Sequence, residues 1–176
     1  LIACADMLGI KDSVVFSNTR VEFEQMNVLH NITDACINIS YAEGFGLSTL
    51  EAMQCGNPII ALKTGGLTRQ VVDHRDGTEN GVALDVDFKS LVGSQQVPFI
   101  YEDYCTHVKT ADAIMKLYEM PIQERKILSK KVRDYVMSEF NHQKTIDAWH
   151  DTLLTLVERW QKKKPPQWKI QELNAQ

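Results

Sequence analysis

Two glutamates eight residues apart, Glu43 and Glu51, flank a glycine-rich segment of the kind that binds phosphate. Gly44 and Gly46 lack side chains where a ligand would approach the backbone. The segment leads into a helix that begins near Gly46 or Leu47. This helix would direct free N–H groups and its positive dipole end toward the same place. A phosphate group suits such a position.

The two carboxylates lie on opposite sides of that phosphate position. Glu51 is expected roughly 6–7 Å along the helix axis, and Glu43 stays in the loop before the glycines. A carboxylate accepts two hydroxyl hydrogen bonds well, so it suits a vicinal diol. A nucleotide sugar offers ribose hydroxyls on one side of its diphosphate and a hexose on the other. Taken without its surroundings, the same pair would be a solvated loop acid and a helix-surface acid.

The surrounding sequence predicts a parallel α/β sheet that positions this segment. Apolar runs predict strands at Ser13–Ser17, Ala35–Ser40, Ile59–Leu62 and Gly81–Leu84. Apolar residues at helical spacing predict helices near residues 1–8, 22–31, 47–55, 67–72, 108–118, 121–139 and 143–160.

Two parts of the chain stand apart from this pattern of strands and helices. The stretch 85–103 shows no clear period, although Phe88, Leu91 and Val92 have the character of packing residues and 93–96 resembles a loop. The helix at 143–160 carries an apolar stripe of the kind that most often packs in a core. Its members are Ile146, Trp149, Leu153, Leu156 and Trp160.

The block from Glu43 to Pro58 resembles the donor-binding motif of retaining glycosyltransferases with two Rossmann-like domains, the GT-B fold. The likeness is closest to family 4, the glycosyl transferases group 1. Glu43 and Glu51 match its Glu-x7-Glu pattern, followed by Glu-Ala-Met-x-x-Gly-x-Pro, and Thr64-Gly-Gly resembles its second glycine turn. Many relatives place a loop-supporting glutamate where this chain has Arg69. The motifs extend over roughly residues 9–72, and a weaker likeness continues to about residue 160.

This resemblance implies a particular domain organisation. Residues 1–164 would form the C-terminal, nucleotide-sugar-binding half of a GT-B fold, a Rossmann-like sheet with helices on both faces. Residues 165–176 would be a tail that is disordered or docks on an absent N-terminal domain. In GT-B enzymes the final helix crosses back onto the other domain, so the alternative for the stripe at 146–160 is an interface with that absent domain. Four strands are evident where such a domain usually has about six, and the sequence starts within a helical pattern. We therefore expect truncation at the N-terminus.

The resemblance also implies a function, the transfer of a hexose from a nucleoside diphosphate sugar with retention of configuration. Glu43 would be the catalytic carboxylate, acting by positioning and electrostatics on the hydroxyls of the donor sugar. The donor-binding residues would be Gly44, Phe45, Gly46, Leu47, Glu51, Arg20, Val21, Gly65 and Gly66. A surface loop at Arg20 and Val21, and a plain tight turn at Gly65 and Gly66, are the alternatives left open.

The donor and the partners follow from the same resemblance. GDP-mannose is favoured over UDP-sugars because many members with this block are mannosyltransferases. The acceptor, a glycan or another molecule, would be bound by the absent N-terminal domain. No cofactor or metal is expected, and the five histidines show no metal-ligand spacing. The alternatives are a phosphorylase or sugar-nucleotide epimerase on the same fold, or a non-catalytic nucleotide-binding module.

Composition excludes several other classes of protein. The 176 residues carry a net charge of −4, with no basic excess that would indicate nucleic acid or an anionic membrane. No run of 18 apolar residues predicts a membrane span, and there is no signal-peptide pattern. The four cysteines form no CxxC pair. These features predict a cytoplasmic protein.

Overall fold

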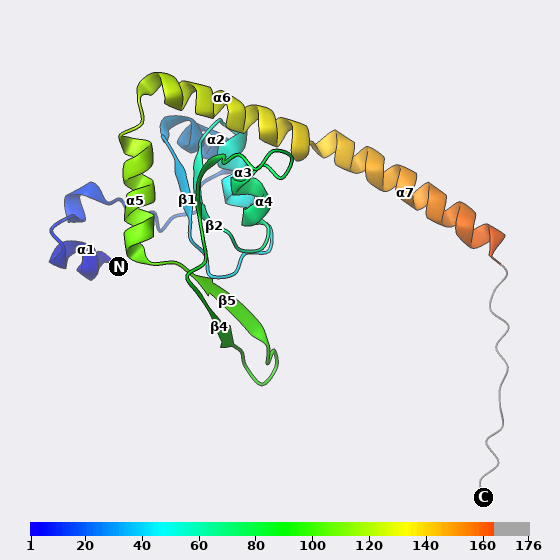
Figure 1. The fold of residues 1–176 in the computed structure, drawn as a ribbon, viewed down its shortest axis with the longest axis horizontal. Helices are drawn as coiled ribbons and strands as arrows, with labels where there is room; N and C mark the ends of the chain where they lie inside the picture. The colour runs from blue at the N-terminus through cyan, green and yellow to red at the C-terminus, as the bar shows by residue number, and fades with distance from the viewer. Residues whose placement is uncertain (164–176) are drawn as a thin grey trace, which may run out of the picture.

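The computed structural model describes residues 1–163, which form an α/β architecture around a three-stranded parallel sheet (Figure 1). Strands β1 (Cys36–Asn38), β2 (Ile59–Leu62) and β3 (Gly81–Leu84) follow one another in space in the order of the chain. All four residues of β2 pair with β3, from Ile59 opposite Gly81 onward. The predicted strands at 35–40, 59–62 and 81–84 are thus confirmed.

The remaining elements are seven α-helices, one short 3-10 helix and a two-stranded antiparallel hairpin. They are α1 (Ile2–Met7), η1 (Lys11–Ser13), α2 (Phe23–Ile32), α3 (Leu47–Gln54), α4 (Leu67–Val71), β4 (Phe88–Val92), β5 (Ile100–Tyr104), α5 (His107–Tyr118), α6 (Ile122–Glu139) and α7 (His142–Lys162).

Helices cover both faces of the parallel sheet because alternate side chains of β2 point to opposite faces. Ile59 and Ala61 join a buried cluster with residues of α3, α4 and α6. Ile60 and Leu62 join a second cluster with β3 and α5. All four side chains of β2 are buried, as expected for the central strand of a doubly covered parallel sheet.

The strand predicted at Ser13–Ser17 is wrong. Lys11–Ser13 forms a 3-10 turn, and residues 14–18 have no regular structure. Val15 is 94% exposed, so this apolar run is not packed on the sheet. A short strand persists only when a neighbour pairs with its backbone, and among the described residues the sheet ends at β1.

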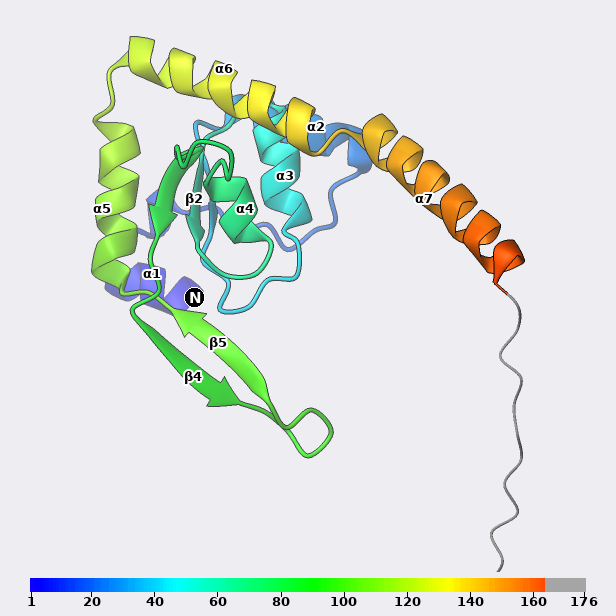
Figure 2. The ribbon, with the colours of Figure 1, turned by 45° about the vertical axis from the view of Figure 1, so that its right-hand side comes forward.

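The stretch 85–103, which gave no clear prediction, contains most of the β4–β5 hairpin. Figure 2 shows this hairpin extending from the end of the parallel sheet where β3 leaves it. Its five residue pairs run from Phe88 opposite Tyr104 to Val92 opposite Ile100. The loop-like residues 93–96 lie in the turn between the two strands.

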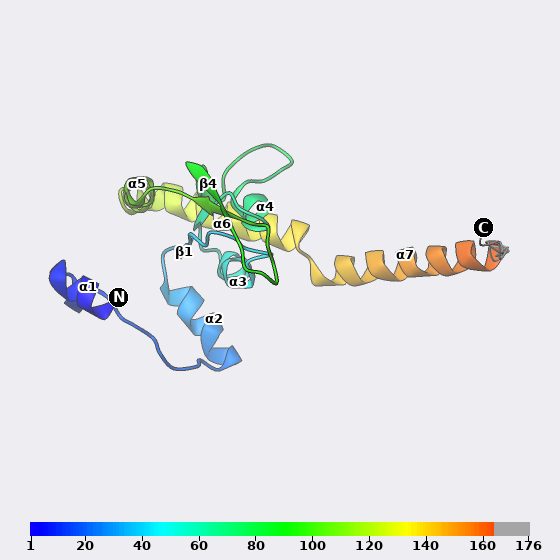
Figure 3. The same cartoon turned by 90° about the horizontal axis from the view of Figure 1, so that it is seen from below.

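The prediction that the stripe of α7 packs in a core is also wrong for the described chain. Figure 3 shows α7 leading away from the sheet. None of its residues is buried, and Trp149 and Trp160 are 64% and 75% exposed. No helix within residues 1–163 is long and apolar enough to cross a membrane. The predicted tail, residues 165–176, lies outside the described residues.

Candidate functional site

The Glu43 loop, residues 41–46, joins the carboxyl end of β1 to α3. In parallel α/β sheets, ligands bind at this edge. Glu43 is half-buried, and its Oε1 accepts a hydrogen bond of 3.4 Å from the Phe45 backbone N–H. The carboxylate therefore bends back over the loop it belongs to, beside the start of α3.

The N-terminus of α3 has features that favour an anion. Its N-cap is Gly46, which has a φ of 87° and supplies no side-chain cap. No acidic residue lies in the first turn, and Leu47 is 66% exposed. The first N–H groups of a helix have no acceptor within the helix, so here they are available to a ligand. The side of Gly44 is open, because a Cβ there would have no neighbour within 4 Å.

A second turn, Lys63–Gly66, packs directly against the Glu43 loop. The Gly66 N–H donates to the Glu43 carbonyl oxygen over 3.3 Å. A Cβ on Gly65 would lie 1.8 Å from that same oxygen, and one on Gly66 would lie 2.7 Å from Phe45 Cα. Both glycines are thus required by the contact between the two loops, whatever their role toward a ligand.

Gln70 supports the Glu43 loop from inside the protein, a role that was not predicted from the sequence. Its side chain is fully buried and donates to the carbonyl oxygens of Phe45 (2.6 Å) and Gly46 (3.1 Å). Its Oε1 accepts a 2.6 Å hydrogen bond from the Thr49 hydroxyl. A lone glutamine in a short helix gives no sequence signal of this role.

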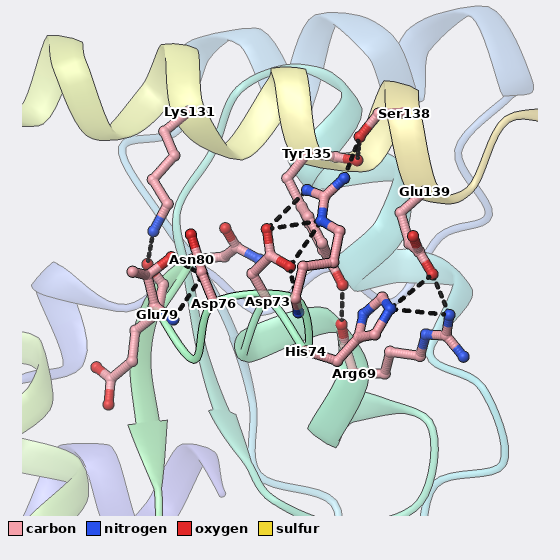
Figure 4. A network of polar contacts seen from close by, with 12 residues as sticks. Arg69, Asp73, His74, Asp76, Glu79, Asn80, Lys131, Tyr135, Ser138 and Glu139 are labelled. Atoms are coloured by element: carbon pink, nitrogen blue, oxygen red, sulfur yellow. Dashed lines mark hydrogen bonds and ion pairs between the residues drawn. The ribbon is translucent and has the colours of Figure 1, made fainter.

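Arg69, where relatives often have a loop-supporting glutamate, points away from the Glu43 loop (Figure 4). Its guanidinium pairs with Glu139 at the end of α6, close to His74. Its backbone carbonyl accepts a 2.5 Å hydrogen bond from the Tyr135 hydroxyl. Loop support therefore comes from the neighbouring residue Gln70, and Arg69 joins α4 to α6.

Glu51 lies on α3 at the edge of a cavity of about 470 Å³ between α2 and α3. Its Oε2 is 4.0 Å from His30 Nε2, a buried atom with no hydrogen-bond partner among the described residues. Asn27 and Cys55 line the same cavity. The carboxylate is 46% exposed and remains accessible to a ligand.

The structure gives less support to the remaining predicted site residues. Arg20 and Val21 lie in the segment before α2; Arg20 is exposed and forms no ion pair with any described residue. A larger cavity, of about 580 Å³, lies beside Pro58 at the amino end of β2 and contains neither Glu43 nor Glu51. Within residues 1–163, no three His, Cys, Asp or Glu side chains gather as a metal site would require.

Comparison with known proteins identifies the part of the chain that holds this site. The family model of glycosyl transferases group 1 matches residues 1–87. The chain is 39% identical over 74 residues to D-inositol 3-phosphate glycosyltransferase 2 of Catenulispora acidiphila, which is 42% of this chain and 17% of that protein. It is 38% identical over 103 residues to D-inositol 3-phosphate glycosyltransferase of Mycobacterium marinum, which is 54% of this chain and 22% of that protein. The chain thus spans less than a quarter of the length of these relatives.

A solved structure extends the likeness to most of the chain. Sucrose-phosphate synthase from Thermosynechococcus elongatus superposes with a TM-score of 0.63 and 25% sequence identity, over 88% of this chain and 33% of that one. The fold is accordingly the Rossmann-like α/β arrangement of a GT-B glycosyltransferase. Residues 1–87, which hold both glutamates and both glycine turns, are thus similar to the glycosyl transferases group 1 family.

Proposed function

We propose that this chain is the donor-binding part of a retaining glycosyltransferase, which transfers a hexose from a nucleoside diphosphate sugar to an acceptor hydroxyl. The observation that supports the proposal most is the uncapped N-terminus of α3, which opens between Glu43 and Glu51. A diphosphate at this helix end would carry its nucleoside toward Glu51 and its sugar toward Glu43.

In the proposed reaction, the bond between the sugar C1 and the diphosphate oxygen breaks, and its electron pair stays with the diphosphate. A new bond forms between C1 and the acceptor oxygen on the same face of the sugar, and the acceptor proton leaves with the diphosphate. The N–H groups of Leu47 and Ser48 would stabilise the charge that grows on the leaving group. Their geometry is fixed before the reaction, and such preorganisation favours catalysis.

The two carboxylates would have separate roles. Glu43, braced over its own loop, would orient the hydroxyls of the donor sugar. Glu51, whose Oε2 lies 4.0 Å from His30 Nε2, would accept hydrogen bonds from the ribose. Loss of a hydrogen bond to a charged group costs about 1.5–3 kcal/mol, so each role has a measurable consequence.

GDP-mannose remains the expected donor, on the basis of the family resemblance. The relatives are named for an inositol phosphate and for sucrose phosphate, and neither name specifies mannose. UDP-sugars are therefore the main competing donors. The acceptor would be bound outside this chain, and the cytoplasmic location stays a prediction from the sequence.

The test is a titration of the full-length protein with GDP-, UDP- and ADP-sugars, followed by the same titration of two variants. Glu51→Ala should weaken nucleoside diphosphate binding by about 1.5–3 kcal/mol. Glu43→Gln should lower turnover far more than it weakens nucleotide binding, because this carboxylate faces the sugar. Glu158→Ala, which removes an exposed carboxylate of α7, is the matched control and should change neither quantity.

Unchanged affinity in Glu51→Ala would contradict the proposed binding mode. Saturation by a UDP-sugar without a response to GDP-mannose would correct the donor. Release or use of inorganic phosphate would favour a phosphorylase, and conversion of the donor without any acceptor into its epimer would favour an epimerase. Tight binding without turnover would favour a non-catalytic module.

A further inference from the structure

The β4–β5 hairpin is hydrogen-bonded to the first residue of the Glu43 loop. The backbone N–H of Asp103, on β5, donates to the carbonyl oxygen of Tyr41 over 2.7 Å. The ring of the next residue, Tyr104, packs against Tyr41 at a tilt of 31° with 4.3 Å between ring centroids, and Phe88 stacks on Tyr104 at 4.8 Å. Tyr41 lies only two residues before Glu43, so the hairpin contacts the loop at its base.

The side chain of Asp103 extends this contact to the second turn of the site. It is 8% exposed, and its Oδ1 lies 3.2 Å from Lys89 Nζ on the paired strand. The nearby Thr64 hydroxyl lowers the pKa of Asp103 below its usual range, against the opposing effect of burial. The Thr64 hydroxyl itself donates over 3.4 Å to the Tyr41 carbonyl oxygen, which also accepts from the Asp103 N–H.

Thr64 begins the turn that holds Glu43. The next two residues, Gly65 and Gly66, touch the backbone of Glu43 with no space for a Cβ at Gly65. The hairpin, through the Asp103 N–H, and the second turn, through the Thr64 hydroxyl, therefore meet at the Tyr41 carbonyl oxygen, two residues before Glu43. An isolated two-stranded hairpin is marginally stable, so contacts at its base fix both the hairpin and the loops it touches.

We propose that the β4–β5 hairpin braces the donor site, and that Asp103 is the positioning residue through which it holds the backbone around Glu43. This inference rests on the proposed function, in which Glu43 orients the donor sugar. Displacing a catalytic group by about 1 Å can lower a rate roughly 100-fold, so a brace of this kind acts on turnover. The nucleoside side of the site, at Glu51, has no contact with the hairpin in this scheme and should be unaffected.

The test uses Asp103→Asn in the full-length protein, with release of nucleoside diphosphate from the sugar donor as the readout. The amide keeps the size of the side chain and the backbone N–H to Tyr41, and removes the buried charge that pairs with Lys89. We expect turnover to fall about tenfold or more, with the Kd of the free nucleoside diphosphate unchanged. Asp112→Asn, an exposed aspartate of α5, is the charge-matched control.

A double-mutant cycle separates positioning from general stability. If Asp103 acts through Glu43, then Asp103→Asn should have little further effect on turnover in the Glu43→Gln background. Multiplied losses in the double variant, or unchanged turnover in the single variant, would overturn the brace. A nucleotide Kd that weakens together with the Tm would overturn it too, because it would indicate loss of structure. Thr64→Val gives the same comparison if Asp103→Asn does not fold.

The failure of the brace is distinguishable from the failure of the proposed function. A wild-type protein that uses no sugar donor would contradict both. An active wild-type protein, with Glu43→Gln impaired and Asp103→Asn unimpaired, would contradict the brace alone.

Discussion

At the scale of single residues, the site depends on glycines that serve different purposes. Gly65 adopts a φ of 46° and sits against the Glu43 carbonyl oxygen, where a Cβ would approach to 1.8 Å. Gly44, three residues before α3 begins, has open space where its Cβ would lie. Gly65 is needed for the contact between the two loops, while Gly44 leaves open space beside the N-terminus of α3.

This difference predicts that alanine at Gly65 lowers stability, whereas alanine at Gly44 weakens ligand binding. Gly65→Ala should lower the free energy of unfolding by more than about 2 kcal/mol, because the clash is with backbone that cannot move aside and the φ is unfavourable. Gly44→Ala should leave stability within about 0.5 kcal/mol of the wild type and weaken binding of a nucleoside diphosphate. Urea unfolding and calorimetry measure both quantities. Equal stability of the two variants would contradict the tight contact between Gly65 and the Glu43 backbone.

Only part of the structure around Glu43 and Glu51 could be predicted from the sequence. Residue types and spacing predicted the loop, the helix after it and the strands on either side, since these depend on local signals. Gln70 and Asp103 were not predicted, because each contacts the site across more than twenty residues of sequence. A single glutamine or aspartate carries no local mark of a distant partner.

At the scale of elements, α6 holds the loop that follows α4. Figure 4 shows Asp73 and Tyr135 close together between that loop and the helix. Arg75 hydrogen-bonds to both carboxylate oxygens of Asp73, and its guanidinium lies over the Tyr135 ring at 4.9 Å. These bonds lower the pKa of Asp73 to about 2. Burial, followed by the negative charges of Glu139 and Asp73, raises the pKa of Tyr135 to about 12.

The Asp73–Arg75 pair predicts a specific acid dependence of stability. The folded-state pKa of Asp73 lies below its ordinary value of 3.8, so the pair stabilises the fold above about pH 4. This contribution, on the order of 1–2 kcal/mol, should be lost as the pH falls from 4 toward 2. Arg75→Gln should flatten the dependence in that range, and Arg133→Gln, an exposed arginine of α6, should not. Urea midpoints at several pH values test this; parallel curves for all three proteins would refute it.

The wrong strand prediction near residues 13–17 and the missed β4–β5 hairpin both depend on whether a neighbouring strand is present to pair with. Val14, Val15 and Phe16 have the composition of a strand, but no described segment pairs with them, and β1 remains the edge of the sheet. The hairpin strands were missed for the opposite reason. Ile100–Tyr104 mixes apolar and acidic residues without the alternation that indicates a strand. This segment is a strand because it pairs with β4 and because the Tyr104 ring packs against Tyr41.

At the scale of the whole molecule, the described chain consists of a packed α/β body and an arm. The two buried apolar clusters of the body lie on β2, on β3 and on the helices that cover them. The arm is α7, which begins after Asn141 and has no buried residue. The Asn141 side chain caps it by accepting a 3.0 Å hydrogen bond from the Lys144 N–H. Helix propensity and this cap, without packing, would then hold α7 together.

Such an arm should unfold independently of the body. A helix of about 20 residues without tertiary packing is marginally stable, so the backbone amides of α7 should exchange with solvent far faster than those of β2. A matched pair of substitutions adds an energetic test: Val136→Ala on α6, where the side chain is fully buried, and Val157→Ala on α7, where it is 53% exposed. The first should lower the free energy of unfolding by about 2 kcal/mol through the cavity it leaves, and the second by less than about 0.5 kcal/mol. Hydrogen exchange and urea unfolding of residues 1–176 give both measurements. Similar losses in the two variants, or slow exchange throughout α7, would mean that the stripe of α7 is packed against apolar surface in solution.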